Sequence, residues 1–314
     1  MRIPFLARAI AAFTAVSLSA TPVLAQTQTL PAPVSPTQVP AADKEVSAPL
    51  HPALWVVKDD DTTIYLFGTM HVLKPGLNWF NGPIARALDN SGQLVTEILD
   101  PTGADTQSAV LSRAVLPADK DLRTMMDDKQ RTAYEALLAR IKLPSAAFDR
   151  FKPWYVAVVL SSLPLIKHGL DPKSGAEALL EKKAREDGKP QGALETVDYQ
   201  LGLFDSLPYD AQLAYLSAVV DEYDQVVPQI DALVKAWGNG DAEALAKQMN
   251  SDMDDPRLKQ TLLIQRNEHW AKWIAERLAK PGTVFVAVGA GHLAGDGSVQ
   301  DQLKGLGIKT ARVQ

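Results

Sequence analysis

The sequence carries two histidines in the same short motif, Gly-x-x-His, and each motif follows a segment typical of a β-strand. Residues 63–71 read TIYLFGTMH and residues 283–292 read TVFVAVGAGH. Glycine permits a tight backbone where a strand must end and present the next side chain. Ligands of open α/β sheets bind at the carboxyl ends of strands, so the two imidazoles can converge on one pocket. The alternative is that each histidine is structural and satisfied by local hydrogen bonds. The repetition of the motif favours a shared site; its glycines and histidines are Gly68, His71, Gly289 and His292.

A metal site or an acid/base site also needs a carboxylate, and Glu97 is the first candidate. Residues 94–99 read LVTEIL, and period-two alternation places Glu97 on a face with apolar neighbours. The alternative is a glutamate on an edge strand, in contact with water. Glu195 follows another short strand candidate, residues 191–194, and its alternative is a carboxylate that begins a helix.

A buried arginine is the third feature that indicates a site. The apolar periodicity predicts a helix from Leu258 to Ala279, and Arg266 lies on its inward stripe, four residues from both Leu262 and Trp270. A guanidinium on a buried face needs a carboxylate or an anionic substrate group, because it cannot be neutralised. The alternative is that Arg266 extends its charged end along the helix to solvent.

Several common chemistries are excluded by what the sequence lacks. The chain has no cysteine, so a metal site must use histidine and carboxylate. The His-Glu-x-x-His, Gly-x-Ser-x-Gly and phosphate-loop motifs are absent. Residues 289–294 match the form of a dinucleotide-binding turn, but only 20 residues follow Ala294, and the next strand ends in Arg-Val-Gln with no acidic residue to hold a ribose. Nucleic acid is not an expected partner, because the net charge is −5 and no basic stripe is present.

The N-terminal segment predicts export. Residues 1–25 have the charged, apolar, small-residue order of a cleavable signal peptide, and the apolar run is too short to span a bilayer. Residues 26–52 contain six prolines among polar and small residues, which is typical of a disordered linker. We therefore expect a periplasmic or secreted protein without stable membrane insertion once the signal is removed. The oligomeric state is not indicated.

The remaining chain, residues 53–314, is expected to form one α/β domain. Strand patterns lie near both ends of it, and helical periodicity dominates between them, so we predict a mixed sheet made by the N- and C-terminal parts with a long helical insertion at about 107–280. The predicted strands are residues 54–58, 63–67, 93–99, 191–194, 283–288 and 308–313, and a further helix is predicted at 298–306.

Together these motifs resemble the TraB/GumN family, which includes the Tiki metalloproteases. The resemblance covers residues 54–313 and rests on an ordered set: residues 65–71, Glu97, residues 193–196 with Gln200, Leu201, Phe204 and Asp205, then Arg266, Asn267 and Trp270, and residues 289–293. It implies an α/β domain with paired Gly-x-x-His motifs and a helical middle. In the Tiki branch it also implies peptide hydrolysis that depends on a divalent metal.

The chemistry of the candidate residues suggests a role for each of them. His71 and His292 would be neutral metal ligands, with Glu97 as a third ligand or as the base for a bound water. Nitrogen and oxygen donors suit Mn, Co or Zn. Arg266 would stabilise an oxyanion or hold a substrate carboxylate, and Glu195 would orient a histidine.

Three functions remain open at this stage. The first is a divalent-metal-dependent hydrolase that acts on peptides or proteins. The second is a hydrolase that uses histidine and glutamate as a metal-free acid/base couple, in the manner of an esterase. The third is a non-catalytic binding or regulatory protein that captures a peptide, haem or another small ligand.

Overall fold

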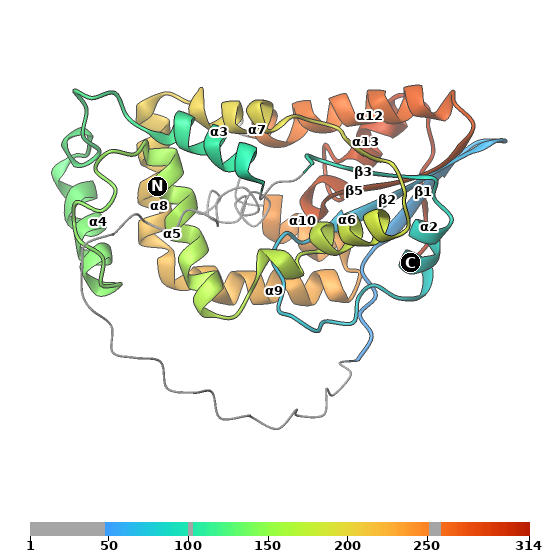
Figure 1. The fold of residues 1–314 in the computed structure, drawn as a ribbon, viewed down its shortest axis with the longest axis horizontal. Helices are drawn as coiled ribbons and strands as arrows, with labels where there is room; N and C mark the ends of the chain where they lie inside the picture. The colour runs from blue at the N-terminus through green and yellow to red at the C-terminus, as the bar shows by residue number, and fades with distance from the viewer. Residues whose placement is uncertain (1–47, 100–102, 251–258) are drawn as a thin grey trace.

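The structure is a computed structural model that describes residues 48–99, 103–250 and 259–314 (Figure 1). The predicted signal peptide and most of the predicted linker lie outside these residues. Residues before the predicted domain start at Ala53 already contact the domain. The backbone N–H groups of Leu50 and His51 donate hydrogen bonds to the carbonyls of Asn78 and Gly238.

A six-stranded mixed sheet forms the centre of the domain, in the order β4-β3-β5-β2-β1-β6. The strands are β1 (Leu54–Lys58), β2 (Thr62–Thr69), β3 (Gln93–Thr96), β4 (Gln191–Ala193), β5 (Gly282–Gly289) and β6 (Ala311–Arg312). Strands β4, β3, β5 and β2 run parallel to one another, whereas β1 is antiparallel to both β2 and β6. The predicted α/β fold with a mixed sheet is therefore confirmed, and β4 joins the sheet from within the helical insertion.

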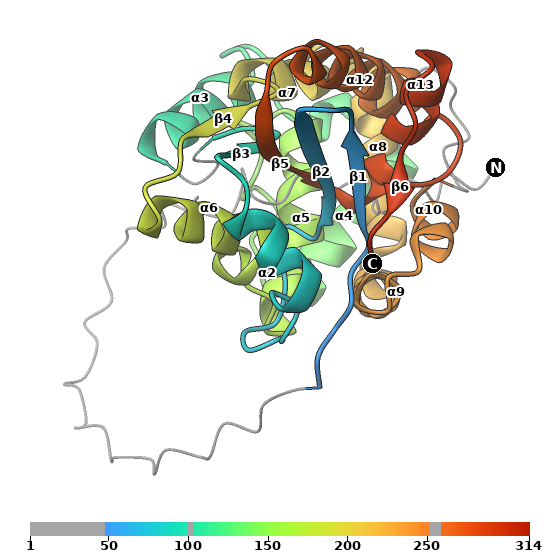
Figure 2. The ribbon, with the colours of Figure 1, turned by 90° about the vertical axis from the view of Figure 1, so that its right-hand side faces the viewer.

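Helices cover both faces of the sheet (Figure 2). The helices are α2 (Gly82–Asp89), α3 (Ala104–Ala114), α4 (Asp128–Arg140), α5 (Pro153–Lys167), α6 (Ala176–Glu186), α7 (Val197–Asp205), α8 (Tyr209–Asp221), α9 (Val226–Gly238), α10 (Ala242–Asn250), α12 (Gln265–Leu278) and α13 (Val299–Gly305). Alternation along β5 explains the layering: Val284, Val286 and Val288 pack with α12 and α13, whereas Phe285 and Ala287 pack with α2, α6 and α9.

The helices of the insertion lie beside the sheet (Figure 1), and they share an apolar core of their own. Helices α3, α4, α5, α7 and α8 pack together there around large side chains such as Trp154, Phe204 and Tyr215. None of the helices in the described ranges has the length and apolarity needed to cross a membrane.

The main differences from expectation lie at element ends. Strand β3 stops at Thr96 and β6 is only Ala311–Arg312, so both are shorter than predicted. The predicted start of the late helix, Leu258, lies outside the described residues. The rest of that helix forms as expected, but a π-helical turn (Gln260–Ile264) precedes α12. The hydrophobic periodicity does not distinguish a π turn from a regular α turn.

Candidate functional site

Four predicted site residues follow the carboxyl ends of four neighbouring parallel strands. His71 follows β2, His292 follows β5, Glu97 follows β3 and Glu195 follows β4. The last residues of β2 and β5, Thr69 and Gly289, are paired in register. Past the ends of β3 and β4, the N–H of Glu195 still donates to the carbonyl of Glu97 at 2.8 Å. The sheet therefore brings all four residues to one edge, as the repeated motif predicts.

Arg266 lies at the centre of this group. It is fully buried, and its Nη2 donates to Glu97 Oε2 at 2.6 Å and to Glu195 Oε2 at 2.8 Å. Its guanidinium carbon lies 4.8 Å from the ring centre of Trp270, one helical turn along α12. Arg266 thus contacts carboxylates, one of the two kinds of partner expected for a buried guanidinium, and its side chain does not extend to solvent.

All five N–H donors of Arg266 are used within the protein. In addition to the two bonds above, Nε donates to Glu195 Oε1 at 2.8 Å, and Nη1 donates to the carbonyl of Leu262 at 3.4 Å and to His292 Nε2 at 3.1 Å. No donor is left in this arrangement for an oxyanion or a substrate carboxylate. The contacts of Arg266 therefore support a positioning role and not the expected direct contact with substrate.

Glu97 is held as a carboxylate by bonds to both of its oxygens. Oε1 accepts from the N–H of Gly289 at 2.7 Å, and Oε2 accepts from Arg266 and, at 3.1 Å, from Gln200 Nε2. Burial alone raises the pKa of such a carboxyl, but the charge of Arg266, with His292, His71 and the Gly289 N–H, lowers the pKa of Glu97 to about 2. Glu97 is therefore ionised and a weak base.

His292 is held as a neutral imidazole of defined tautomer. Asn267 Nδ2 donates to the carbonyl of Gly297 at 2.7 Å, so its Oδ1 faces His292 Nδ1 at 2.6 Å and accepts the proton on that nitrogen. The Nε2 lone pair then accepts from Arg266. Burial and the adjacent guanidinium lower the pKa of His292 to about 3.

His71 is different, because one of its ring nitrogens is left available. Nδ1 lies 2.6 Å from Glu177 Oε1, and the Thr69 hydroxyl also donates to that oxygen. Burial lowers the pKa of His71, but the charge and hydrogen bond of Glu177 outweigh it and the net shift is upward. His71 Nε2 is buried and has no hydrogen-bond partner within the described ranges. A carboxylate that fixes one nitrogen while the other is open is the arrangement of a general base or a metal ligand.

Glu177 was not identified by the sequence reasoning. It lies in the first turn of α6, whose Ala176 N–H donates to the carbonyl of Met70 at 2.9 Å. This close approach needs Gly175, because a Cβ there would lie 2.1 Å from the carbonyl oxygen of His71. A glycine followed by a glutamate in the first turn of a helix was the available signal. No local sequence pattern, however, shows that this helix packs against the first Gly-x-x-His motif.

The motif glycines make room for side chains. Neither Gly68 nor Gly289 has a positive φ, so a left-handed turn is not their function. A Cβ on Gly289 would lie 3.2 Å from Glu97 Oε1, 3.6 Å from His71 Nε2 and 3.7 Å from His292 Cδ2. A Cβ on Gly68 would lie 3.0 Å from the Cα of Ala290. Gly289 thus borders a small space on which His71 Nε2 and Glu97 Oε1 converge.

Replacing Gly289 with alanine should therefore impair the site without unfolding the domain. Its φ of −50° suits alanine, while the added methyl group occupies the space between His71 and Glu97. We expect a loss of activity on the order of 10²-fold, as for other small misplacements in active sites. Gly202→Ala is the matched control, since nothing lies within 4 Å of a Cβ at this position in α7. It should leave activity unchanged, and an equal loss in both variants would contradict the assignment.

The three residues predicted to bind a metal do not form a metal site as they are placed. His292 Nε2 and Glu97 Oε2 both accept hydrogen bonds from Arg266, and only His71 Nε2 is open. In the part of the chain that the structure describes, no three His, Asp or Glu side chains are grouped so that they could hold a metal ion. The donor arrangement therefore does not fit a metal held jointly by His71, His292 and Glu97.

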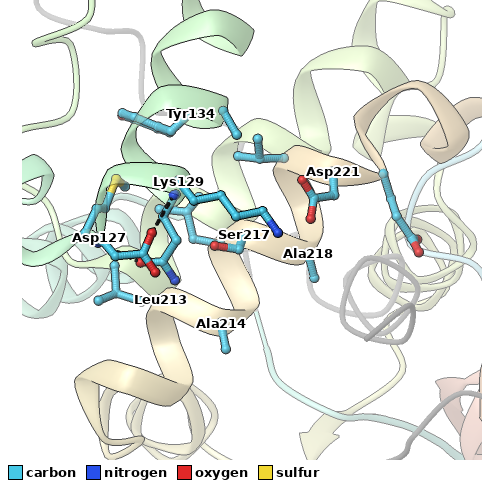
Figure 3. A pocket seen from close by; sticks show the side chains of 14 residues that line it. Asp127, Lys129, Tyr134, Leu213, Ala214, Ser217, Ala218 and Asp221 are labelled. Carbon is cyan, nitrogen blue, oxygen red and sulfur yellow. Dashed lines mark hydrogen bonds between the residues drawn. The ribbon is translucent and has the colours of Figure 1, made fainter. Parts of the chain in front are cut away.

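A separate hollow lies in the helical insertion, between α4 and α8 (Figure 3). It has a volume of about 450 Å³, and Asp127, Lys129, Tyr134, Ser217 and Asp221 are among its lining residues. None of its lining residues is a predicted site residue. The chemistry-bearing group at the sheet edge is therefore distinct from this hollow.

The fold and site define an α/β protein in which the ends of four parallel strands bring two histidines and two glutamates to one sheet edge, beside a buried arginine. The chain belongs to the TraB/PrgY/gumN family, which it matches over residues 53–312. The expected family resemblance is thus confirmed over nearly all of the predicted domain.

Three relatives indicate the breadth of this similarity. YbaP of Escherichia coli K12, described as uncharacterized, is 25% identical over 258 residues, which cover 81% of this chain and 92% of YbaP. An uncharacterized protein of Treponema pallidum is 21% identical over 267 residues, 80% of this chain and 79% of its own length. The zebrafish (Danio rerio) protein named Metalloprotease TIKI2 is 24% identical over 319 residues, 83% of this chain and 61% of TIKI2. No solved structure matches the chain significantly.

Proposed function

We propose that this protein is a hydrolase that cleaves peptide bonds, with His71 as the base that activates water. The observation that carries the proposal is the Nε2 of His71, which is buried and has no hydrogen-bond partner among the described residues. Its Nδ1 is bound to Glu177, and Nε2 faces the same small space as Glu97 Oε1. The name of the relative TIKI2, a metalloprotease, supports peptides as the substrate class.

In the proposed step, a water bound beside Gly289 contacts both His71 Nε2 and Glu97 Oε1. Nε2 accepts a proton from the water as its oxygen attacks the substrate carbonyl carbon. The carbon–nitrogen bond then breaks, and the proton passes from Nε2 to the leaving nitrogen. Glu177 stabilises the imidazolium formed between these two transfers, and Glu97 orients the water by accepting a hydrogen bond from its second O–H.

The remaining residues of the site position these groups. Arg266 fixes Glu97 and Glu195, and Glu195 also accepts from Trp270 Nε1 at 3.0 Å. The role expected for Glu195, orienting a histidine, is taken at His71 by Glu177 instead. His292, held neutral between Asn267 and Arg266, forms one wall of the site and takes no proton in this scheme.

Metal dependence is supported by the name of one relative, whereas the donor arrangement argues against it. We therefore propose chemistry that uses His71, Glu177 and Glu97 without a metal ion. Mn, Co and Zn are included in the test below, because they are the ions that suit a histidine and carboxylate site.

The proposed setting is the periplasm or the extracellular medium, with peptides or proteins as partners and no nucleic acid. The signal-peptide pattern of residues 1–25 supports export, and the absence of a basic stripe in the sequence argues against nucleic acid.

The test is incubation of the chain from Gln26 onward with a diverse peptide library, followed by mass spectrometry of the products. Parallel reactions contain a chelator, Mn, Co or Zn. Cleavage that survives the chelator supports the proposal, and cleavage only with added metal contradicts its metal-free form. Binding of peptides without cleavage in any condition would favour the alternative of a capture protein.

Glu177→Gln should shift the pH profile of the reaction. The free base is the active form of His71, so kcat/KM should rise as the pH passes through the raised pKa of His71 and level off above it. Removing the negative charge of Glu177 destabilises the imidazolium and lowers this pKa. The rising limb should therefore move to lower pH, and the plateau should fall by about 10- to 100-fold because the base is weaker.

The exposed Glu186, on the same helix, provides the matched control. Its carboxylate pairs with Lys183 at 3.3 Å on the surface, so Glu186→Gln should change neither the limb nor the plateau. A purely structural role of Glu177 would lower the plateau and leave the limb where it is.

A further inference from the structure

The guanidinium of Arg266 lies where three metal-compatible side chains meet. Nη2 is 2.6 Å from Glu97 Oε2 and 2.8 Å from Glu195 Oε2, and Nη1 is 3.1 Å from His292 Nε2. The side chains of Arg266, Glu97 and Glu195 are 1%, 7% and 5% exposed, so this positive charge is largely withdrawn from water.

These three acceptors are of the donor types that bind divalent metals, but with Arg266 between them the described residues are not grouped so that they could hold an ion. Two carboxylates and one imidazole with open positions suit a divalent transition ion. Both glutamates come from strand ends and His292 is fixed by Asn267, so the backbone positions of all three do not depend on Arg266. The side chain that holds them together comes from the neighbouring helix α12.

We infer that the Arg266 guanidinium is the built-in cation of this site and takes the place that a divalent metal would occupy among Glu97, Glu195 and His292. A guanidinium does not lose its proton in proteins, so it cannot vacate the place by becoming neutral. A metal ion could bind there only if the buried guanidinium lost its hydrogen bonds to Glu97, Glu195 and His292, and leaving a buried charge unpaired is costly. The native chain therefore binds no divalent ion here, and removing the guanidinium creates a site for one. This inference goes beyond the proposed function and does not depend on catalysis.

Calorimetric titration with Co²⁺ tests the inference without an activity assay. Wild type should bind no stoichiometric Co²⁺, and Arg266→Ala should bind one equivalent. The double variant Arg266→Ala/His292→Ala should lose that binding at least tenfold, because it lacks the imidazole donor. If wild type binds one equivalent that His292→Ala or His71→Ala abolishes, the inference is overturned.

A second measurement distinguishes a true absence of Co²⁺ binding from a folding defect of the variant. Thermal unfolding followed by circular dichroism, with and without Co²⁺, should show stabilisation of Arg266→Ala and none of wild type, because binding to the folded state stabilises it. Arg266→Gln serves in place of the alanine variant if the latter does not fold. A folded variant at this position that binds no Co²⁺ would also overturn the inference, whether or not the wild-type protein proves to be a hydrolase.

Discussion

His71→Asn is expected to reduce the rate of peptide cleavage by about 10²- to 10⁴-fold, the range that general-base catalysis contributes. Asparagine retains a polar group that can reach Glu177, but it has no ring nitrogen to take a proton from water. The fold should persist, because the neighbouring contacts of Thr69 and of the N-terminus of α6 do not need the imidazole. Initial rates measured by mass spectrometry, with circular dichroism of the same samples, check this expectation.

His168→Asn is the matched control for the loss of a histidine paired with a carboxylate. His168 Nε2 lies 3.0 Å from Asp231 Oδ2, but the two side chains are 33% and 49% exposed and lie outside the proposed site. We expect wild-type rates from this variant. Equal losses in both variants, or no loss in His71→Asn, would show that His71 is not the base.

Arg266→Met should destabilise the domain by about 3–5 kcal/mol, because it leaves the buried carboxylates of Glu97 and Glu195 without their cation. Methionine is similar in length, so the lost volume is small and the effect is mainly electrostatic. For a domain of this size, such a loss lowers Tm by roughly 10 °C. Chemical denaturation at neutral pH measures the free energy of unfolding directly.

Arg140→Met removes a surface ion pair of similar geometry for comparison. Arg140 lies 2.6 Å from Asp224, with side chains 52% and 66% exposed, so the expected loss is at most about 1 kcal/mol. If Arg266→Met costs no more than this control, the buried group is not held together by Arg266.

Much of the site was predictable because strand ends and helical stripes are local features. The repeated Gly-x-x-His motif located His71 and His292, and the alternation of residues 94–99 located Glu97. The four-residue spacing of Leu262, Arg266 and Trp270 correctly placed a charge on a buried face. In each case the pattern identifies which side chain is buried, but not which groups it meets.

What could not be predicted are the pairings between segments far apart in sequence. Glu177 contacts His71 only because α6 packs against the end of β2, and Gln200 reaches Glu97 only because α7 follows β4. The surroundings of the expected metal ligands could not be predicted for the same reason. The sequence shows three possible donors, whereas only the packing of α12 shows that Arg266 occupies the place between two of them.

Hydrolysis in ¹⁸O-labelled water tests the central claim most directly. The chain from Gln26 onward is incubated with the peptide library and a chelator in that solvent, beside His71→Asn. The account predicts new carboxyl termini that carry one ¹⁸O atom with wild type, and at least about 10²-fold fewer of them with His71→Asn. Unlabelled or absent products with wild type, or equal yields from the two proteins, would contradict it.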